Sequence, residues 1–318
     1  MSRRLRRLLR TVAVRARPKC LNVARLLSAL PGTHRGGRPA VANISEETIA
    51  ALKRKATILR RHIVRMTHNV QSGHPGGSMS ACDLVTALYF HVLRVDPKNP
   101  TWPDRDRFVL SKGHACPVWY AALAERGFFP VDELMTFRKL NSRLQGHPEV
   151  GTTPGVENAA GAEGQGLSFS VGLSLAARMD HTAWRVYCLM GDGEQDVGQT
   201  WEAAMAAAKY GLDNLTAIID RNGIQQEGRT EDIMPLEPLQ NKWEAFNWHV
   251  LTIDGHDFRQ ILAAIEEAQR TKGRPTVIIA RTVKGKGVSF MENKIKYHGA
   301  ATTDEELHMA LSELEVHS

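Results

Sequence analysis

The chain has 318 residues, of which 42% are hydrophobic, 24% charged and 6% aromatic. This composition is typical of a globular protein with a sizeable buried core, and it excludes collagen-like, disulfide-rich and intrinsically disordered proteins. The longest uncharged apolar stretch, Gly164 to Ala177, is shorter than the ~18 residues of a membrane-spanning helix, so we expect no membrane segment.

The four cysteines lie far apart and form no CxxC pair: Cys20, Cys82, Cys116 and Cys188. Such spacing indicates reduced thiols rather than a disulfide framework or a zinc site. We therefore predict a cytoplasmic protein.

The positive charge of the chain is concentrated at its N-terminus. The whole chain carries a formal charge of +7, and residues 1–40, with ten Arg, one Lys and no acidic residue, carry +11, so residues 41–318 carry −4. A mildly acidic body is not expected to form a nucleic-acid groove. We predict that residues 1–40 are a disordered basic extension. An organellar transit peptide, an arm for RNA or anionic lipid, and an inert extension are the alternatives for its role.

The ordered part is predicted to begin at Ser45. Ser45 is a suitable N-cap, and Glu46 and Glu47 follow it where the helix dipole favours negative charge. Apolar residues then recur every three or four positions up to Val70, which predicts a helix with one buried face. Gly73 is expected to end this helix.

Helices and strands alternate in the rest of the chain. Helical patterns cover residues 80–93, 116–127, 166–179, 199–211, 236–246, 257–271 and 303–314. Short β-branched or apolar runs lie between the later helices, at residues 185–190, 215–220, 249–253 and 276–280. Strands separated by helices indicate βαβ crossovers. We predict that residues 41–318 form one α/β domain, a doubly wound parallel sheet with helices on both faces.

An aspartate between two glycines directly follows the predicted strand at 185–190, in Gly191-Asp192-Gly193. The glycines permit a tight turn and a close approach of the backbone to a bulky anion. In doubly wound sheets, ligands bind beyond the carboxyl ends of the strands, where helix N–H groups also point. The triplet alone is weak evidence, because most such triplets are simply turns.

Asn222 strengthens this interpretation. Twenty-eight residues separate it from Gly193, and it ends the next predicted strand, so in a parallel sheet the two strand ends are expected to be neighbours. Asp192, the Asn222 amide oxygen and the Ile224 carbonyl would then bind one hard divalent cation and leave positions for phosphate oxygens and water. The sequence therefore predicts a diphosphate bound through Mg²⁺, and two unrelated turns are the alternative.

A GDG triplet followed by a distant Asn resembles the thiamine diphosphate motif, and the segments around it resemble the N-terminal part of transketolases. These segments occur in the family's order: Ser72-Gly73-His74-Pro75-Gly76-Gly77, Arg105-Asp106-Arg107-Phe108-Val109-Leu110-Ser111-Lys112-Gly113-His114, Gly146-His147-Pro148-Glu149, Gly191-Asp192-Gly193, Asp220-Arg221-Asn222-Gly223 and Tyr297-His298-Gly299. The resemblance implies the thiamine diphosphate-binding fold, as a domain of the diphosphate-binding (PP) type.

The resemblance also implies roles for individual residues. The metal ligands are expected to be Asp192, Asn222 and Ile224. The residues that bind thiamine diphosphate are expected to be His114, Gly161, Glu163, Gly193, Asn222 and His298. The catalytic residues are expected to be His74, His114, His147 and His298. Imidazole suits the proton transfers that cleavage of a ketose requires near neutral pH, and all four histidines lie in glycine-rich segments between predicted elements.

The segments match only the diphosphate-binding half of a transketolase. The resemblance therefore implies the N-terminal subunit of a split transketolase. With a C-terminal partner subunit that binds the pyrimidine ring, in an α2β2 assembly, it would transfer a two-carbon ketol unit between sugars or sugar phosphates. A subunit of a thiamine-dependent decarboxylating synthase or dehydrogenase is one alternative, which the sugar-binding histidines disfavour. A non-catalytic regulatory pseudo-subunit is another.

Two positions depart from the transketolase pattern. Glu163 stands where the family usually has Leu, and Val197 stands where it commonly has Glu. A desolvated carboxylate is costly unless it is paired or protonated. We hypothesise that Glu163 partly replaces the missing acid, or that it contacts an unusual donor or the partner subunit. An impaired or specialised site is the alternative.

Three further side chains are ambiguous. His256 is expected to cap the helix that follows it. Lys284 and Lys286 flank Gly285 in a predicted loop. They would either close over the diphosphate or only solvate the loop, and the sequence favours neither role.

Overall fold

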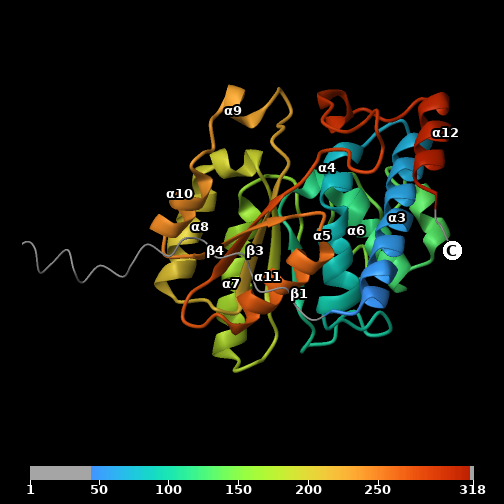
Figure 1. Cartoon of the computed structure of the whole chain (residues 1–318). Coiled ribbons are helices and arrows are strands. Elements are labelled where there is room, and N and C mark those ends of the chain that lie inside the picture. Colours follow the sequence, from blue (N-terminus) through green and yellow to red (C-terminus); the bar gives the residue numbers. More distant parts are fainter. Residues whose placement is uncertain (1–43, 316–318) are drawn as a thin grey trace, which may run out of the picture. The chain divides into compact units, whose positions relative to one another are not determined.

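The computed structural model describes residues 44–315, which belong to one compact unit. The predicted extension at 1–40 and Cys20 lie outside the described residues. Five parallel strands form one sheet in the order β1-β2-β3-β5-β4 (Figure 1). They are β1 (Arg107–Leu110), β2 (Val186–Gly191), β3 (Leu215–Arg221), β4 (His249–Asp254) and β5 (Thr276–Arg281). The predicted parallel α/β fold is confirmed.

The strand β1 does not appear in the sequence prediction. It has only four residues, it begins with Arg107, and all four residues are buried. The Arg107 guanidinium lies over the Trp184 ring, 4.3 Å from its centroid, so that a cationic residue is tolerated at the start of a buried strand. A run this short carries no recognisable periodicity.

Helices cover both faces of the sheet, because successive strand residues point to opposite sides. Leu189 and Ile218 pack with the helices α3 (Glu46–Asn69), α5 (Cys82–Ala87), α6 (Cys116–Arg126) and α11 (Phe258–Arg270). Cys188 and Ala217, one position earlier in each strand, pack with α7 (Gln165–Met179), α8 (Gly198–Lys209) and α10 (Leu239–Ala245) on the other face. Figure 1 shows the two helix layers with the sheet between them.

Shorter elements connect these layers. They are α4 (Pro75–Ser80), η1 (Leu88–Val92), η2 (Gly113–Ala115), η3 (Val131–Thr136), η4 (Gly193–Asp196), α9 (Thr230–Ile233), η5 (Ile295–His298) and α12 (Asp304–Glu313). The region predicted as one helix at 80–93 is therefore divided between α5 and the π-helical η1, and only its first residue, Ser80, belongs to α4.

The N-terminal helix α3 begins as predicted but ends earlier than predicted. The Ser45 hydroxyl accepts a hydrogen bond from Thr48 N at 3.1 Å, which is the expected N-cap. The helix ends at Asn69 because Gln71 already adopts a left-handed conformation, with φ +48°. Gly73 lies beyond the helix end and leads the chain into α4.

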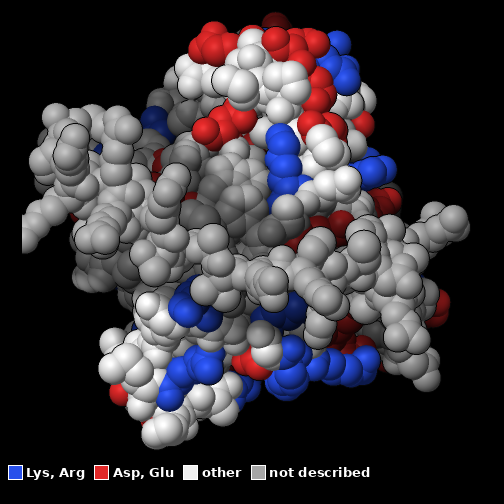
Figure 2. All heavy atoms as spheres, turned by 90° about the vertical axis from the view of Figure 1, so that its left-hand side faces the viewer, with Lys and Arg blue, Asp and Glu red and all other residues white. Residues whose placement is uncertain are grey.

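The surface described by the structure carries both signs of charge. On the face seen in Figure 2, acidic side chains gather at the upper end, where Figure 1 places α9, and basic ones gather at the lower end. Both acidic residues of α9, Glu231 and Asp232, are exposed. Among residues 44–315, no helix is both long and apolar enough to cross a membrane. Cys82, Cys116 and Cys188 are buried free thiols.

We predict that Ile218→Ala in the central strand lowers the free energy of unfolding by about 2–5 kcal/mol, because it leaves a cavity between the sheet and its helices. Met179→Ala, at a side chain that is 78% exposed, should change it by less than about 0.5 kcal/mol. Chemical denaturation followed by tryptophan fluorescence measures both. Equal losses in the two variants would contradict the assigned core.

Candidate active site

The candidate site lies along the carboxyl edge of the sheet. Because all strands are parallel, β1, β2, β3 and β5 end at this same edge. The residues that follow them are Ser111 to His114, Asp192 and Gly193, Asn222 to Ile224, and Thr282 to Lys284. Neighbouring strand order thus brings together residues that lie up to 173 positions apart in the chain.

Residues from each of these four strand ends line one cavity of about 330 Å³. All ten predicted site residues line it: His74, His114, His147, Gly161, Glu163, Asp192, Gly193, Asn222, Ile224 and His298. Residues without a firm role in the sequence analysis line it as well: Gly77, Lys112, Gly191, Gln225, Gln226 and Lys284. The structure therefore places the predicted residues together, while their individual roles stay predictions.

The three predicted metal ligands lie on two adjacent turns. The Asp192 carboxylate accepts a hydrogen bond from Gly223 N at 2.6 Å, and the Asn222 amide oxygen accepts one from Ile224 N at 3.1 Å. Burial, followed by the charge of Asp220, raises the pKa of Asp192, so a bound cation would relieve an unfavourable carboxylate. Among residues 44–315, no cluster of three His, Cys, Asp or Glu side chains could hold a metal. The donor set of one carboxylate, one amide and one carbonyl instead fits a Mg²⁺ that takes its other ligands from phosphate and water.

Two buried lysines supply positive charge to this cavity. Lys112 is 1% exposed, and its Nζ donates to Asp220 at 2.5 Å and to the Gly77 carbonyl at 3.2 Å. Lys284 is 2% exposed, and its Nζ lies 2.9 Å from the Ile224 carbonyl and 2.8 Å from His298 Nδ1. Burial, followed by the charge of Lys112, lowers the pKa of Lys284 to about 8. Two ammonium groups beside the predicted metal ligands suit a diphosphate.

The structure separates Lys284 from Lys286, which the sequence could not do. Lys286 is more exposed and pairs with Glu292 at 3.3 Å, away from the cavity lining. The loop of Lys284 is held by His256, whose Nε2 accepts from Val283 N at 2.9 Å and whose Nδ1 lies 2.7 Å from Asp83. The expected cap role of His256 is wrong: Asp257 is the N-cap of α11.

Asp220 is a buried acceptor that the sequence analysis did not identify. It is fully buried, and besides Lys112 it accepts hydrogen bonds from the hydroxyls of Ser80, at 2.6 Å, and Thr282. Burial alone would raise the pKa of Asp220, but the Lys112 ammonium and these donors hold it below its usual range. Asp220 therefore stays ionised and fixes the ends of β1, β3 and β5 relative to α4.

Three of the four predicted histidines form a compact cluster. The ring centroids of His74, His114 and His298 lie 5.2 to 5.4 Å apart. Burial, followed by neighbouring positive charge, lowers the pKa of His74 to about 4 and that of His298 to about 3, and burial also lowers the pKa of His114. The three imidazoles are therefore neutral at pH 7. His74 Nδ1 is buried without a hydrogen-bond partner, which leaves it free for a ligand.

His147 lines the same cavity from an exposed position at its rim. It belongs to the long segment between η3 and α7 that also carries Gly161 and Glu163. This segment therefore forms one wall of the cavity.

Glu163 has a histidine as its partner. Its carboxylate points to His114, with 3.1 Å between Oε1 and Nδ1. The side chain of Val197 instead lies against Gly164, where an added Cβ would be 2.5 Å from Val197 Cγ1.

The buried carboxylate beside Val197 belongs to Glu194. It is fully buried and accepts hydrogen bonds from Gly164 N at 2.7 Å, from Gly191 N at 3.1 Å and from the Ser111 hydroxyl. Burial raises the pKa of Glu194 to about 7. Glu194 is not among the residues predicted from the sequence, although an acidic residue two positions after Asp192, in a turn that follows a buried strand, is a usable signal.

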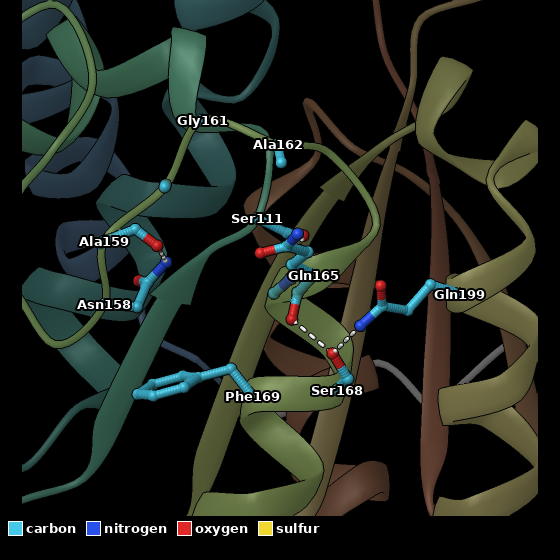
Figure 3. Close-up of a pocket in the computed structure, with 11 residues that line it drawn as sticks. Ser111, Asn158, Ala159, Gly161, Ala162, Gln165, Ser168, Phe169 and Gln199 are labelled. Carbon is cyan, nitrogen blue, oxygen red and sulfur yellow. Dashed lines mark hydrogen bonds between the residues drawn. The ribbon is translucent and has the colours of Figure 1, made fainter.

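A second cavity, of about 360 Å³, lies on the other side of the segment 159–164 and shares Gly161 with the first. Figure 3 shows Gln199 Nε2 donating to the Ser168 hydroxyl, which in turn donates to the Gln165 carbonyl, with Phe169 at the edge. Its lining contains no charged side chain. It therefore lacks the cationic side chains that the first cavity offers to a diphosphate, and it holds no histidine or carboxylate for acid–base chemistry.

Comparisons with known proteins agree with this geometry. A family model described as the thiamine diphosphate binding domain of transketolase matches residues 52–317. The 6-deoxy-6-sulfo-D-fructose transketolase subunit SqwG of a Clostridium species is 45% identical over 272 residues, which cover 86% of this chain and 98% of that protein. An apulose-4-phosphate transketolase subunit from Phocaeicola vulgatus is 42% identical over 255 residues, covering 80% of this chain and 90% of that protein.

Larger transketolases match over only part of their length. The crystal structure of the Campylobacter jejuni transketolase superimposes with a TM-score of 0.79 and 36% identity, covering 83% of this chain and 42% of that one. Human transketolase is 40% identical over 255 residues, covering 80% of this chain and 40% of that protein. The chain thus spans less than half the length of these larger proteins and nearly all of the two subunits.

We predict that the free energy of unfolding of the cofactor-free chain falls as the pH is lowered from about 6.5 towards 4. The unfolded chain takes up a proton at His74 in this range, whereas in the folded chain burial holds the pKa of His74 at about 4. His74→Asn should reduce this slope, as denaturation midpoints measured across the range will reveal. Met179→Ala should leave the slope unchanged, and a slope that survives His74→Asn in full would contradict the assignment.

We predict that Glu194→Ala loosens the segment 159–166, because it leaves the Gly164 and Gly191 N–H groups buried without an acceptor. A cost of about 1–3 kcal/mol is expected for each such group. Hydrogen exchange in peptides that cover 159–166 should speed up, while Glu202→Ala, at an exposed residue of α8, should leave it unchanged. Unaltered exchange in Glu194→Ala would show that this carboxylate does not anchor the segment.

Proposed function

Because the chain belongs to the transketolase family, in which it corresponds to the N-terminal, thiamine diphosphate-binding half, we propose that it acts as one subunit of a two-subunit transketolase. The family and the half that the sequence predicted are confirmed. The proposed reaction transfers a two-carbon ketol unit from a ketose to an aldose, as sugars or sugar phosphates, with thiamine diphosphate and a divalent cation.

One observation carries this proposal. Oxygen ligands from the ends of β2 and β3 meet two buried ammonium groups from the ends of β1 and β5 in a single cavity. Asp192, Asn222 and the Ile224 carbonyl would hold Mg²⁺ on the diphosphate, and Lys112 and Lys284 would balance its remaining charge. When bound there, thiamine diphosphate supplies the carbanion chemistry that cleaves a C–C bond next to a ketose carbonyl.

The histidines would handle the protons of this reaction. His74, His114 and His298 are neutral near pH 7, so each ring has one nitrogen that accepts a proton and one that donates. His147 at the rim would contact the sugar hydroxyls that lie farther from the cofactor. This arrangement suits a polyhydroxylated donor better than a simple keto acid, which disfavours the decarboxylating enzymes.

The proposed partner is a C-terminal transketolase subunit that binds the pyrimidine ring. The support is the similarity to two proteins named as transketolase subunits, which this chain covers almost completely. We propose an α2β2 assembly of the two subunits. The cytoplasmic location stays a prediction.

We predict that Asp192→Ala and Asn222→Ala together weaken binding of thiamine diphosphate, in the presence of Mg²⁺, by about 100-fold or more. Replacing a residue that only hydrogen-bonds a metal ligand already lowers metal affinity by about 10–100-fold. Calorimetry on the chain reconstituted with its partner subunit measures this. Asp180→Ala, at an exposed carboxylate of the same type, is the matched control. Unaltered affinity in the double variant would refute the proposed metal site.

The same reconstituted pair tests the reaction. Ketol transfer is expected with thiamine diphosphate and Mg²⁺ present and should be lost without either. A pair that binds the cofactor but transfers no ketol unit would favour the regulatory pseudo-subunit.

A further inference from the structure

The contact between Glu163 and His114 has no assigned role. Glu163 Oε1 lies 3.1 Å from His114 Nδ1, and the two side chains are 37% and 17% exposed. This contact lies inside the cavity that both residues line. It joins a carboxylate to a histidine of the proposed proton-transfer cluster.

The backbone on both sides of Glu163 is held in place. Before it, Ala160 packs directly on Gly113, the neighbour of His114, where an added Cβ would be 2.6 Å from the Ala160 Cβ. After it, Gly164 N donates to the buried Glu194 carboxylate at 2.7 Å. The backbone of this segment is therefore fixed in position next to the start of η2. Because the backbone is anchored on both sides of Glu163, its side chain extends from a fixed point towards His114.

The contact selects one tautomer of His114. A carboxylate at Nδ1 favours the proton on that nitrogen and leaves Nε2 as the acceptor. Nε2 faces the interior of the cavity: an added Cβ at Gly77 would be 3.5 Å from both His114 Nε2 and Lys112 Nζ. The nitrogen left free is thus the one that faces the predicted cofactor position.

Glu163 also opposes the charges around His114. Lys112 after β1 and Lys284 after β5 both lower the pKa of His114, and Glu163 raises it. The other titratable groups packed against this ring are the neutral imidazoles of His74 and His298. An imidazolium that forms at His114 during proton transfer would therefore have Glu163 as its counter-charge.

We propose that Glu163 is a positioning residue for His114: it holds the imidazole with its proton on Nδ1 and presents Nε2 to the sugar donor as a proton acceptor. The proposal rests on the proposed transketolase function for the identity of the donor. In the step concerned, the O–H bond of a donor hydroxyl breaks as its proton moves to His114 Nε2, and the proton returns to oxygen later in the cycle. Glu163 keeps its own charge throughout.

The tautomer itself is tested without any turnover. In the full chain labelled with ¹⁵N-histidine, two-bond ¹H–¹⁵N correlation spectra distinguish the two tautomers, and His114→Asn identifies the signal. Wild-type protein should show the proton on Nδ1. Glu163→Gln, whose amide oxygen can accept from Nδ1, should keep this tautomer, and Glu163→Leu should lose it. A proton on Nε2 in the wild type, or a Leu variant with an unchanged spectrum, would overturn the proposal.

Kinetics on the pair reconstituted with the partner subunit give a second readout. Glu163→Leu should lower kcat by about 10–100-fold, as expected for a residue that orients a catalytic group, with the Kd of thiamine diphosphate changed less than about twofold. Glu163→Gln should fall between the wild type and Glu163→Leu. Glu47→Leu and Glu47→Gln, at an exposed residue of α3, are matched controls.

The two readouts separate the two proposals. A loss of cofactor affinity equal to the loss of kcat would mean that Glu163 serves binding and would overturn the positioning role. A wild-type pair without ketol transfer would count against the proposed function, while the NMR spectra would still decide the tautomer.

Discussion

The buried carboxylate of Asp220 holds the carboxyl edge of the sheet together. It lies at the end of the central strand β3 with no exposed surface, and it accepts hydrogen bonds from Lys112 after β1, Ser80 in α4 and Thr282 after β5. Losing one partner of such a buried pair costs about 3–5 kcal/mol, because the other charge stays buried. This one carboxylate therefore joins the segments that carry Lys112, Ser80 and Thr282 at the edge of the cavity.

The same charges that make the cavity attractive to a diphosphate also keep its histidines neutral. Lys112 and Lys284 lie beside the imidazoles, and their positive charge adds to burial in lowering the pKa values of His114 and His298. Neutral rings are what proton transfer near pH 7 requires. The loop of Lys284 is held in place because Val283 N donates to His256, which in turn contacts Asp83.

Two carboxylates connect the segment 159–164 to the residues around it. Glu194 binds its backbone from the protein interior, at Gly164 N, and Glu163 extends from it to His114. Glu194 fixes the segment, and Glu163 therefore lies where it contacts His114, which is 49 positions earlier in the chain. Val197, which stands where the family commonly has Glu, thus has the buried carboxylate of Glu194 close by, and Glu163 contacts His114.

Much of this protein could be predicted from the sequence, because some patterns are local. Strands β2 to β5 are β-branched or apolar runs bounded by turns. The GDG triplet begins with the last residue of β2, and Asn222 directly follows β3. Parallel pairing then brings their ends to one edge, whatever the details of packing. The strand β1 was not predicted because its four residues, which begin with Arg107, are too few to show an alternation of apolar and polar side chains.

The sequence by itself thus determined the fold class, the family and the group of residues that meet at the strand ends. Only the tertiary structure decided what those residues touch: the ionised Asp220, the anchoring Glu194, the inward Lys284 and the pairing of Glu163 with His114. Each of these depends on contacts between residues 14 to 140 positions apart. The energy of a buried charge is set by such neighbours and not by its place in the chain.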